Sequence, residues 1–374
     1  MTTPTPTIRI PADLLPSDGR FGSGPAKVRD EAVAGLAAAA STFLGTSHRR
    51  PTVKDLVRNV QEGLADLYGL PAGTEVLLGN GGATAFWDAA ALGLIERKSQ
   101  HLSFGVFSAK FAAVVAGAPH LEPPDVIVAE HGTHPLPVAS ADVDTYALTH
   151  NETTTGVCME IRRPDAAGLV VVDATSAAGA MRADPKQFDV YYFSPQKAFG
   201  SDGGLWVAMC SPAAIDRIER IASTDRYVPA FLSLRIALEN SRQFQTYNTP
   251  ALATLFLLNH QIGWIRSEGG LEWAASRADR NAAVLYEWAE RSDYAFPFVG
   301  VPEERSPVTA TIDFDPAVPA SGVASVLRAN GIVDTESYRK LGRNQLRIGL
   351  WPAIETPDVE ALTRSIDYVV DKLG

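Results

Sequence analysis

The chain has 374 residues, of which 46% are hydrophobic and 20% charged, and its formal net charge is −10. An acidic chain without a basic tract is a poor candidate for binding nucleic acid. No stretch approaches the ~18 consecutive apolar residues of a membrane span. The first residues lack the basic start and apolar run of a signal peptide, so we expect a cytoplasmic protein. The two cysteines, Cys158 and Cys210, make no disulfide framework, and no His/Cys spacing is typical of a zinc site, so we expect no metal.

The order of elements predicts an N-terminal arm and two domains. Residues 1–20, rich in Thr and Pro, read as a loose arm. Residues 21–263 alternate strand, loop and helix, which predicts a large α/β domain with a doubly wound, mostly parallel sheet. Residues 74–96 give a strand, a Gly-rich turn and a helix. Five short apolar runs follow, at 125–132, 145–152, 168–175, 190–197 and 204–210.

Residues 264–374 show a different order and length of predicted helices and strands, which predicts a smaller C-terminal α/β domain. We expect a long helix over 273–291, a strand at 308–314, a helix over 320–332 and a strand at 344–350. Thr356 and Pro357 are typical of a helix start and precede the last predicted helix.

Polar residues stand where three consecutive strands of the large domain end. The strand at 145–149 leads into Thr153, the next ends on Asp173, and the third ends on Gln196 and Lys197. Ligands of open α/β sheets gather at the carboxyl ends of strands. Taken singly, Lys197 could be a solvated lysine and Asp173 a turn cap.

A Gly-rich turn, "GNGGAT", covers Gly79 to Thr84 between a strand and a helix. Its backbone N–H groups and the helix N-terminus are suited to holding a phosphate. The turn matches neither a dinucleotide fingerprint nor a Walker motif, and alone it is as well explained as a structural turn.

These four features together predict a pyridoxal phosphate (PLP) site. The cofactor needs a lysine for its aldehyde, a carboxylate for its ring nitrogen, a hydroxyl and a phosphate cradle. Lys197, Asp173, Thr153 and the turn at 79–84 supply them.

The chain resembles the class V aminotransferase group of the fold-type I PLP enzymes. Within that group it is similar to the phosphoserine aminotransferase family, in its divergent actinobacterial type. The segments that carry the resemblance, from about residue 21 to the end, are "FGSGPAKV", "SHRR", "GNGGAT", "HNETTTG", "VVVDATSAAG", "SPQKAFG", "QTYNTPAL" and "LRIGLWPA".

The resemblance implies a role for each residue that matches a family motif. Lys197 matches the Schiff-base lysine, Asp173 the ring-nitrogen partner and Thr153 the residue that bonds the ring hydroxyl. Phe107 falls where the family usually stacks a tryptophan on the ring. The residues implied to hold the phosphate are Ala83, Thr84 and Gln196, together with Asn248 and Thr249, which reach the cofactor of the neighbouring subunit.

The resemblance also implies a homodimer with shared active sites and a substrate with two anionic groups. Arg347 matches the arginine for the α-carboxylate, and His48 and Arg49 match residues that contact the substrate's other anion. In the alternative interpretation, Thr249 and Pro250 merely start the helix that follows them.

One region departs from the family pattern. Where the family commonly carries a His-Arg pair for the distal charge of the substrate, this chain reads Tyr338 to Arg343 without a histidine. Arg339, Lys340 and Arg343 therefore stay unranked candidates, each equally plausible as a solvated charge.

The activity implied is transfer of an amino group from L-glutamate to the phosphorylated 2-oxo acid 3-phosphohydroxypyruvate, in serine and also pyridoxine biosynthesis. The closest alternative is another class V enzyme, such as a serine– or alanine–glyoxylate aminotransferase. A cysteine desulfurase is disfavoured because Cys158 and Cys210 are badly placed for a mobile nucleophile. A non-catalytic binding protein would not need the lysine, and a nucleotide-binding protein lacks its fingerprint.

Overall fold

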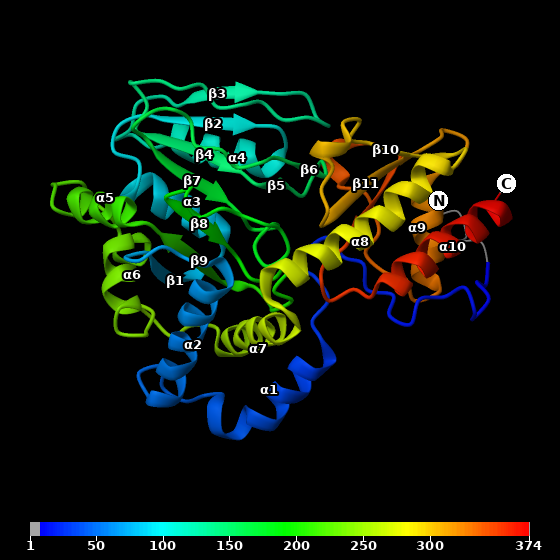
Figure 1. Cartoon of the computed structure of the whole chain (residues 1–374), viewed down its shortest axis with the longest axis horizontal. Coiled ribbons are helices and arrows are strands. Elements are labelled where there is room, and N and C mark those ends of the chain that lie inside the picture. Colours follow the sequence, from blue (N-terminus) through cyan, green and yellow to red (C-terminus); the bar gives the residue numbers. More distant parts are fainter. Residues whose placement is uncertain (1–7, 374) are drawn as a thin grey trace, which may run out of the picture.

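The computed structural model describes residues 8–373 (Figure 1). Residues 1–7 of the expected N-terminal arm lie outside this range. None of the helices between residues 8 and 373 combines the length and the apolar character that crossing a membrane requires.

A seven-stranded sheet forms the centre of the large part of the chain, in the order β1-β9-β8-β7-β4-β2-β3. All neighbouring strands are parallel except that β9 runs antiparallel to both β1 and β8. This confirms the predicted α/β class with a mostly parallel sheet. The strands are β1 (Glu75–Gly81), β2 (Ser99–Ser103), β3 (Asp125–Val128), β4 (Thr145–Thr149), β7 (Leu169–Asp173), β8 (Val190–Phe193) and β9 (Gly204–Cys210).

Helices cover both faces of this sheet because its strands are apolar on both sides. In β7, Val170 and Val172 face the core that includes α2 and α7, whereas Leu169 and Val171 face the core that includes α3 to α6. The helices are α1 (Asp30–Phe43), α2 (Pro51–Tyr68), α3 (Ala83–Gly93), α4 (Val106–Ala116), α5 (Pro212–Ala222), α6 (Leu234–Ser241) and α7 (Leu252–Glu268), with a short turn η1 (Ala230–Leu232).

The C-terminal part is built on an antiparallel sheet, β10-β11-β12, which packs with α8, α9 and α10 to one side of the large sheet (Figure 1). A two-stranded ribbon, β5-β6, lies between β4 and β7 in the chain. The remaining elements are β5 (Asn151–Glu152), β6 (Val157–Cys158), α8 (Gly270–Arg291), β10 (Ala295–Pro297), η2 (Pro302–Glu304), β11 (Thr309–Phe314), α9 (Ala320–Ala329), η3 (Arg339–Leu341), β12 (Gln345–Gly349) and α10 (Thr356–Leu373).

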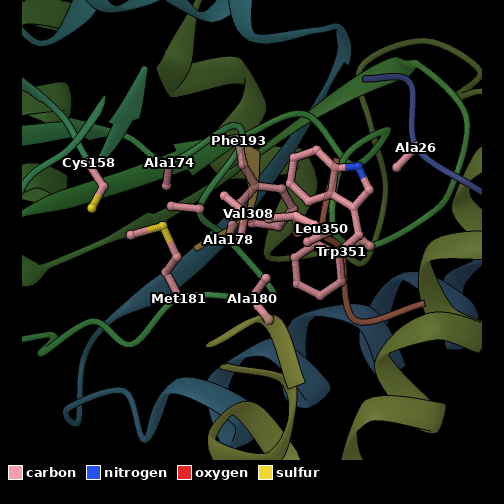
Figure 2. Close-up of a cluster of buried hydrophobic side chains, with 14 of the residues drawn as sticks. Ala26, Cys158, Ala174, Ala178, Ala180, Met181, Phe193, Val308, Leu350 and Trp351 are labelled. Carbon is pink, nitrogen blue, oxygen red and sulfur yellow. The ribbon is translucent and has the colours of Figure 1, made fainter. Parts of the chain in front are cut away.

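The N-terminal segment joins the C-terminal part to the large sheet. The N–H of Gly349 donates to the Phe21 carbonyl (2.8 Å), and the Trp351 indole N–H donates to the Gly22 carbonyl (2.8 Å). Four residues later the N–H of Ala26 donates to the carbonyl of Gln196 (2.7 Å). Figure 2 shows the apolar cluster at this junction, where Trp351 lies beside side chains from β8 and from the turn after β7. The exact boundary between the two expected domains stays a prediction.

Candidate active site

A cavity of about 240 Å³ opens at the carboxyl ends of β4, β7 and β8. This is the edge at which the polar strand ends were expected to meet. Seven of the predicted site residues line the cavity together: Ala83, Thr84, Phe107, Thr153, Asp173, Gln196 and Lys197.

Lys197 is a buried lysine, not a solvated one, with 8% of its surface exposed. Its Nζ donates to the carbonyl of Ser23 (2.9 Å) and to the hydroxyl of Thr153 (3.4 Å). Burial, assisted by the positive charge of Arg347, lowers the pKa of the Lys197 amine to about 7. A large share of this amine is therefore neutral and nucleophilic near neutral pH.

Asp173 ends β7 beside Tyr192 of β8. One oxygen, Oδ1, accepts from the backbone N–H of Thr175 (2.9 Å), and Oδ2 accepts from the indole N–H of Trp87 (3.2 Å). Burial nevertheless raises the pKa of the Asp173 carboxyl. A cationic group bound beside it would reverse this effect, because an opposite charge favours the ionised form.

The Gly-rich turn leads from β1 directly into α3. Gly81 has φ +121°, and a Cβ there would lie 2.6 Å from the Cβ of Ala85, so only glycine fits this turn. The turn thus presents the first backbone N–H groups of α3 to the cavity, which suits an anion.

Several polar atoms at the cavity have no hydrogen-bond partner among the described residues. They are Asn151 Oδ1, Thr175 Oγ1 and Gln196 Oε1. Buried polar atoms are normally paired, so these orphans indicate that the cavity is built for a polar ligand. With the amine, the carboxylate and the anion cradle, the residues present fit PLP.

Phe107 lies at the start of α4, with its ring centre 5.9 Å from Lys197 Nζ. The ring of Tyr338 is 6.4 Å from it, and the Arg347 guanidinium lies over Tyr338 at 5.2 Å. Arg347 Nη1 also donates to the carbonyl of Thr153 (3.4 Å). The predicted carboxylate-binding arginine therefore reaches from β12 to the residues that surround Lys197.

Glu152 is a site residue that the sequence reasoning passed over, although it is the middle residue of the quoted "NET". It is fully buried. Its Oε2 accepts from the N–H groups of Phe107 (3.0 Å) and Ser108 (2.9 Å), and its Oε1 accepts from the Thr154 hydroxyl (2.8 Å). A carboxylate at a helix N-terminus stabilises it, so Glu152 holds the helix that presents Phe107.

Three further residues at the site were not anticipated. Ser23 and Gly24 come from the quoted "FGSGP", whose position beside Lys197 has no local signal. Trp87 lies four residues after Ala83, one helical turn along α3, and that spacing is the only hint that it faces the same cavity.

His48, Arg49, Asn248 and Thr249 form a second group, outside this cavity. His48 Nδ1 is 3.2 Å from the Thr249 hydroxyl, and Arg49 donates to Gln245 Oε1 (2.7 Å). The two groups adjoin through Asn80, which precedes Gly81 and donates to the carbonyl of Thr249 (2.9 Å). The interpretation in which Thr249 and Pro250 start the helix is wrong, because α7 begins at Leu252 with Ala251 as its N-cap.

The three cationic candidates before Arg347 differ in their surroundings. Arg343 forms an ion pair with Asp313 and its guanidinium lies 4.4 Å from the Phe298 ring centre. Arg339 and Lys340 are exposed on η3, directly after Tyr338.

Both cysteines are buried, Cys158 with 9% exposure and Cys210 with 1%. Burial raises the pKa of the Cys158 thiol to about 12 and raises that of Cys210 as well. Neither has the depressed pKa of a catalytic thiol.

The fold and the cavity together define a class V aminotransferase. The sequence pattern of the family described as aminotransferase class-V matches residues 136–336, which include Thr153, Asp173 and Lys197. The chain is therefore a PLP-dependent aminotransferase, as the motifs predicted.

Comparison with full-length relatives shows which family within this class the chain belongs to. The phosphoserine aminotransferase of a Nocardioides species is 55% identical over 373 residues, which cover 99% of this chain and 100% of the relative. That of Rhodococcus jostii is 55% identical over 372 residues, with the same coverage. The solved phosphoserine aminotransferase of Cytophaga hutchinsonii has a TM-score of 0.87 at 24% identity, over 96% of this chain and 100% of that one. The chain belongs to the phosphoserine aminotransferase family.

Proposed function

We propose that this enzyme transfers the amino group of L-glutamate to 3-phosphohydroxypyruvate, giving 2-oxoglutarate and O-phospho-L-serine. One observation carries the proposal: Lys197, Asp173 and the Gly-rich turn meet in one cavity of a chain that is 55% identical to phosphoserine aminotransferases over its length. The reaction belongs to L-serine biosynthesis, and a related phosphorylated oxo acid of pyridoxine biosynthesis is a second acceptor. We place the enzyme in the cytoplasm.

The cavity residues divide the binding of PLP among them. The first N–H groups of α3, at Ala83 and Thr84, would hold the phosphate with Gln196, and Asp173 would pair with the ring nitrogen. The ring hydroxyl of PLP is adjacent to the carbon that lysine attacks. The Thr153 hydroxyl, 3.4 Å from Lys197 Nζ, is placed for it. Phe107 would stack on the ring and contribute roughly 0.5–1.5 kcal/mol beyond the area it buries.

Lys197 has two roles. Its neutral amine would anchor the cofactor, and once released by the substrate amine it would serve as the base that accepts the proton of the substrate Cα and gives it up again. When bound, PLP supplies the electron-withdrawing ring that makes this Cα–H acidic. The pKa of about 7 suits both roles, since the amine must lose and gain a proton near neutral pH.

Two arginines bind the anionic ends of the substrate. Arg347 takes the α-carboxylate, supported by its reach to the Thr153 carbonyl. Charge-assisted, bidentate contacts of this kind are strong and directional. The distal phosphate of the oxo acid and the distal carboxylate of glutamate bind to His48 and Arg49 of the partner subunit. Arg339, Lys340 and Arg343 stay unranked candidates for the same charge.

We further propose a homodimer with shared sites. His48, Arg49, Asn248 and Thr249 gather beside the Gly-rich turn, but none of them lines the cavity of its own chain. A partner subunit packed over this surface would receive all four at its own phosphate and substrate positions.

A screen of amino donors and oxo-acid acceptors tests the substrates. Glutamate should bleach the cofactor absorbance, and 3-phosphohydroxypyruvate should restore it faster than unphosphorylated hydroxypyruvate or glyoxylate. Faster restoration by glyoxylate would instead support a glyoxylate aminotransferase. Lys197→Ala protein serves as the blank.

Subunit exchange tests the shared site. Inactive Lys197→Ala protein is mixed with inactive Arg49→Ala protein. A mixed dimer contains one site with both native residues, so activity should reappear. If the mixture stays inactive after exchange has been demonstrated, Arg49 serves its own subunit.

A further inference from the structure

Trp87 lies between the Gly-rich turn, which is proposed to hold the phosphate, and the Asp173 carboxylate, which is proposed to pair with the ring nitrogen. It is 2% exposed and lines the cavity from α3. Its indole N–H is 3.2 Å from Asp173 Oδ2 and 2.9 Å from the Tyr192 hydroxyl. An indole nitrogen only donates hydrogen bonds, so this contact favours the ionised carboxylate as its acceptor.

The other groups that stabilise Asp173 come from its own sheet edge. Thr175 is two residues further along the chain, and Tyr192 is its neighbour on β8. Both favour the ionised carboxylate, yet burial outweighs them. Trp87, which is 86 positions earlier in the chain, donates a hydrogen bond to the Asp173 carboxylate from α3, on the opposite wall of the cavity.

Helix α3 connects this donor rigidly to the phosphate turn. Ala83 and Trp87 are four residues apart, which is about one helical turn and ~6 Å along the axis. The Trp87 ring is itself held in place by Phe111, with ring centres 6.1 Å apart and planes 15° from parallel. The turn and the donor therefore lie on one continuous helix, and the donor's ring is packed in place.

We propose that Trp87 is a positioning residue for the reaction: its indole N–H orients the Asp173 carboxylate toward the cofactor ring nitrogen and ties that carboxylate to the helix that begins at the phosphate turn. The inference rests on the proposed role of Asp173. It adds a residue that acts through Asp173 and does not touch the reacting atoms.

The competing explanation is that Trp87 only fills space between α3 and the sheet. Trp87→Phe separates the two, since it keeps an aromatic ring and removes the N–H. A positioning role for Trp87 predicts that Trp87→Phe weakens the interaction of Asp173 with the ring nitrogen and leaves the rest of the cofactor site unaffected.

The experiment compares PLP with its 1-deaza analogue, in which a C–H replaces the ring nitrogen. Both keep the aldehyde and the phosphate, and their dissociation constants are measured by equilibrium dialysis against the apoenzyme. Trp87→Phe should weaken PLP binding roughly ten-fold, the size expected for a lost hydrogen bond to a charged group. It should change the affinity for the analogue less than two-fold. Equal losses for both cofactors, or no loss for either, would overturn the inference.

Two further variants make the result specific. Phe111→Leu loosens the packing that holds the Trp87 ring in place without removing the N–H, so it should reduce the preference for PLP in the same direction as Trp87→Phe but by less. Trp87→His keeps a ring N–H and should retain more of the preference for PLP than Trp87→Phe. If only one Trp87 variant folds, judged by thermal unfolding of the apoenzyme, that variant is compared with wild type alone.

Asp173→Asn distinguishes failure of this inference from failure of the proposed function. If Asp173→Asn erases the preference for PLP while Trp87→Phe keeps it, Asp173 has its proposed role and Trp87 does not. If Asp173→Asn also keeps the preference, the ring-nitrogen role of Asp173 is wrong.

Discussion

The amine nitrogen of Lys197 lies 2.9 Å from the carbonyl oxygen of Ser23, a residue 174 positions earlier in the chain. The same short segment accepts hydrogen bonds from Gly349, the last residue of β12, and from Trp351, two residues beyond it. One stretch of backbone thus contacts both the lysine and the strand that carries the carboxylate-binding arginine.

The buried amine predicts how cofactor attachment depends on pH. With a pKa of about 7, its reaction with PLP in the apoenzyme should rise roughly five-fold from pH 6 to 7 and less than two-fold from pH 7 to 8. A solvated lysine would rise about ten-fold per unit over the whole range. The measurement is the rate of borohydride-trapped adduct on each lysine peptide, with exposed Lys110 as the internal comparison.

The charge of Arg347 contributes to the low pKa of Lys197. Arg347→Gln should therefore raise the pKa of the amine, so that the trapping profile moves to higher pH. An unmoved profile would mean that burial alone sets this pKa.

Gly24 should tolerate no side chain. It has φ +130°, and a Cβ there would lie 2.4 Å from Lys197 Nζ. Gly24→Ala must displace the lysine or the segment, so we expect at least a ten-fold slower attachment of PLP at every pH. Gly203→Ala is the matched control, because Gly203 lines the same cavity and a Cβ there would meet nothing within 4 Å. Equal behaviour of the two variants would contradict the prediction.

Replacing Glu152 with glutamine should cost stability and cofactor affinity together. Both Glu152 oxygens accept from donors, so an amide NH₂ in either orientation faces donors and leaves at least one buried N–H unpaired. We expect a loss of about 1–3 kcal/mol in the free energy of unfolding, measured by urea denaturation of the apoenzyme.

The control for this prediction is Glu160→Gln. The Glu160 side chain is 71% exposed and pairs with exposed Arg162. Its replacement should change the unfolding free energy by less than about 0.5 kcal/mol. Similar effects at the two positions would show that Glu152 does not hold α4.

Phe107→Ala should weaken PLP retention several-fold, because the stacked ring is lost. Phe107→Leu keeps most of the apolar volume and loses the π-face, so it should fall between wild type and alanine. If all three proteins retain PLP equally in dialysis, Phe107 is only part of the core.

Local pattern was enough to find the residues at the strand ends. Asp173 and Lys197 follow apolar runs, and parallel strands bring their carboxyl ends to one edge of the sheet. Their meeting in one cavity therefore follows from secondary structure alone. The strand order, with β9 reversed between β1 and β8, has no such local signal.

Contacts between distant segments could not be derived in this way. The placement of Ser23 beside Lys197 depends on where the N-terminal segment crosses the molecule, and that of Trp87 on how α3 is rotated against the sheet. The alternative interpretation, which placed a helix start at Thr249, is wrong for a related reason. The Thr249 hydroxyl lies beside His48, 201 positions away, and is not used as a cap.

The path of the N-terminal segment also sets the order in which the enzyme can be assembled during synthesis. Phe21 and Gly22, next to Ser23, are synthesised long before Gly349 and Trp351, which donate hydrogen bonds to their carbonyls. The large sheet is complete once β9 has emerged at Cys210, and domains generally fold as units from the N-terminus. In a nascent chain, Lys197 would therefore emerge before Gly349 and Trp351 can hold the segment that carries Ser23, and until then the hydrogen bond between Ala26 and Gln196 would be the contact that keeps this segment near the lysine.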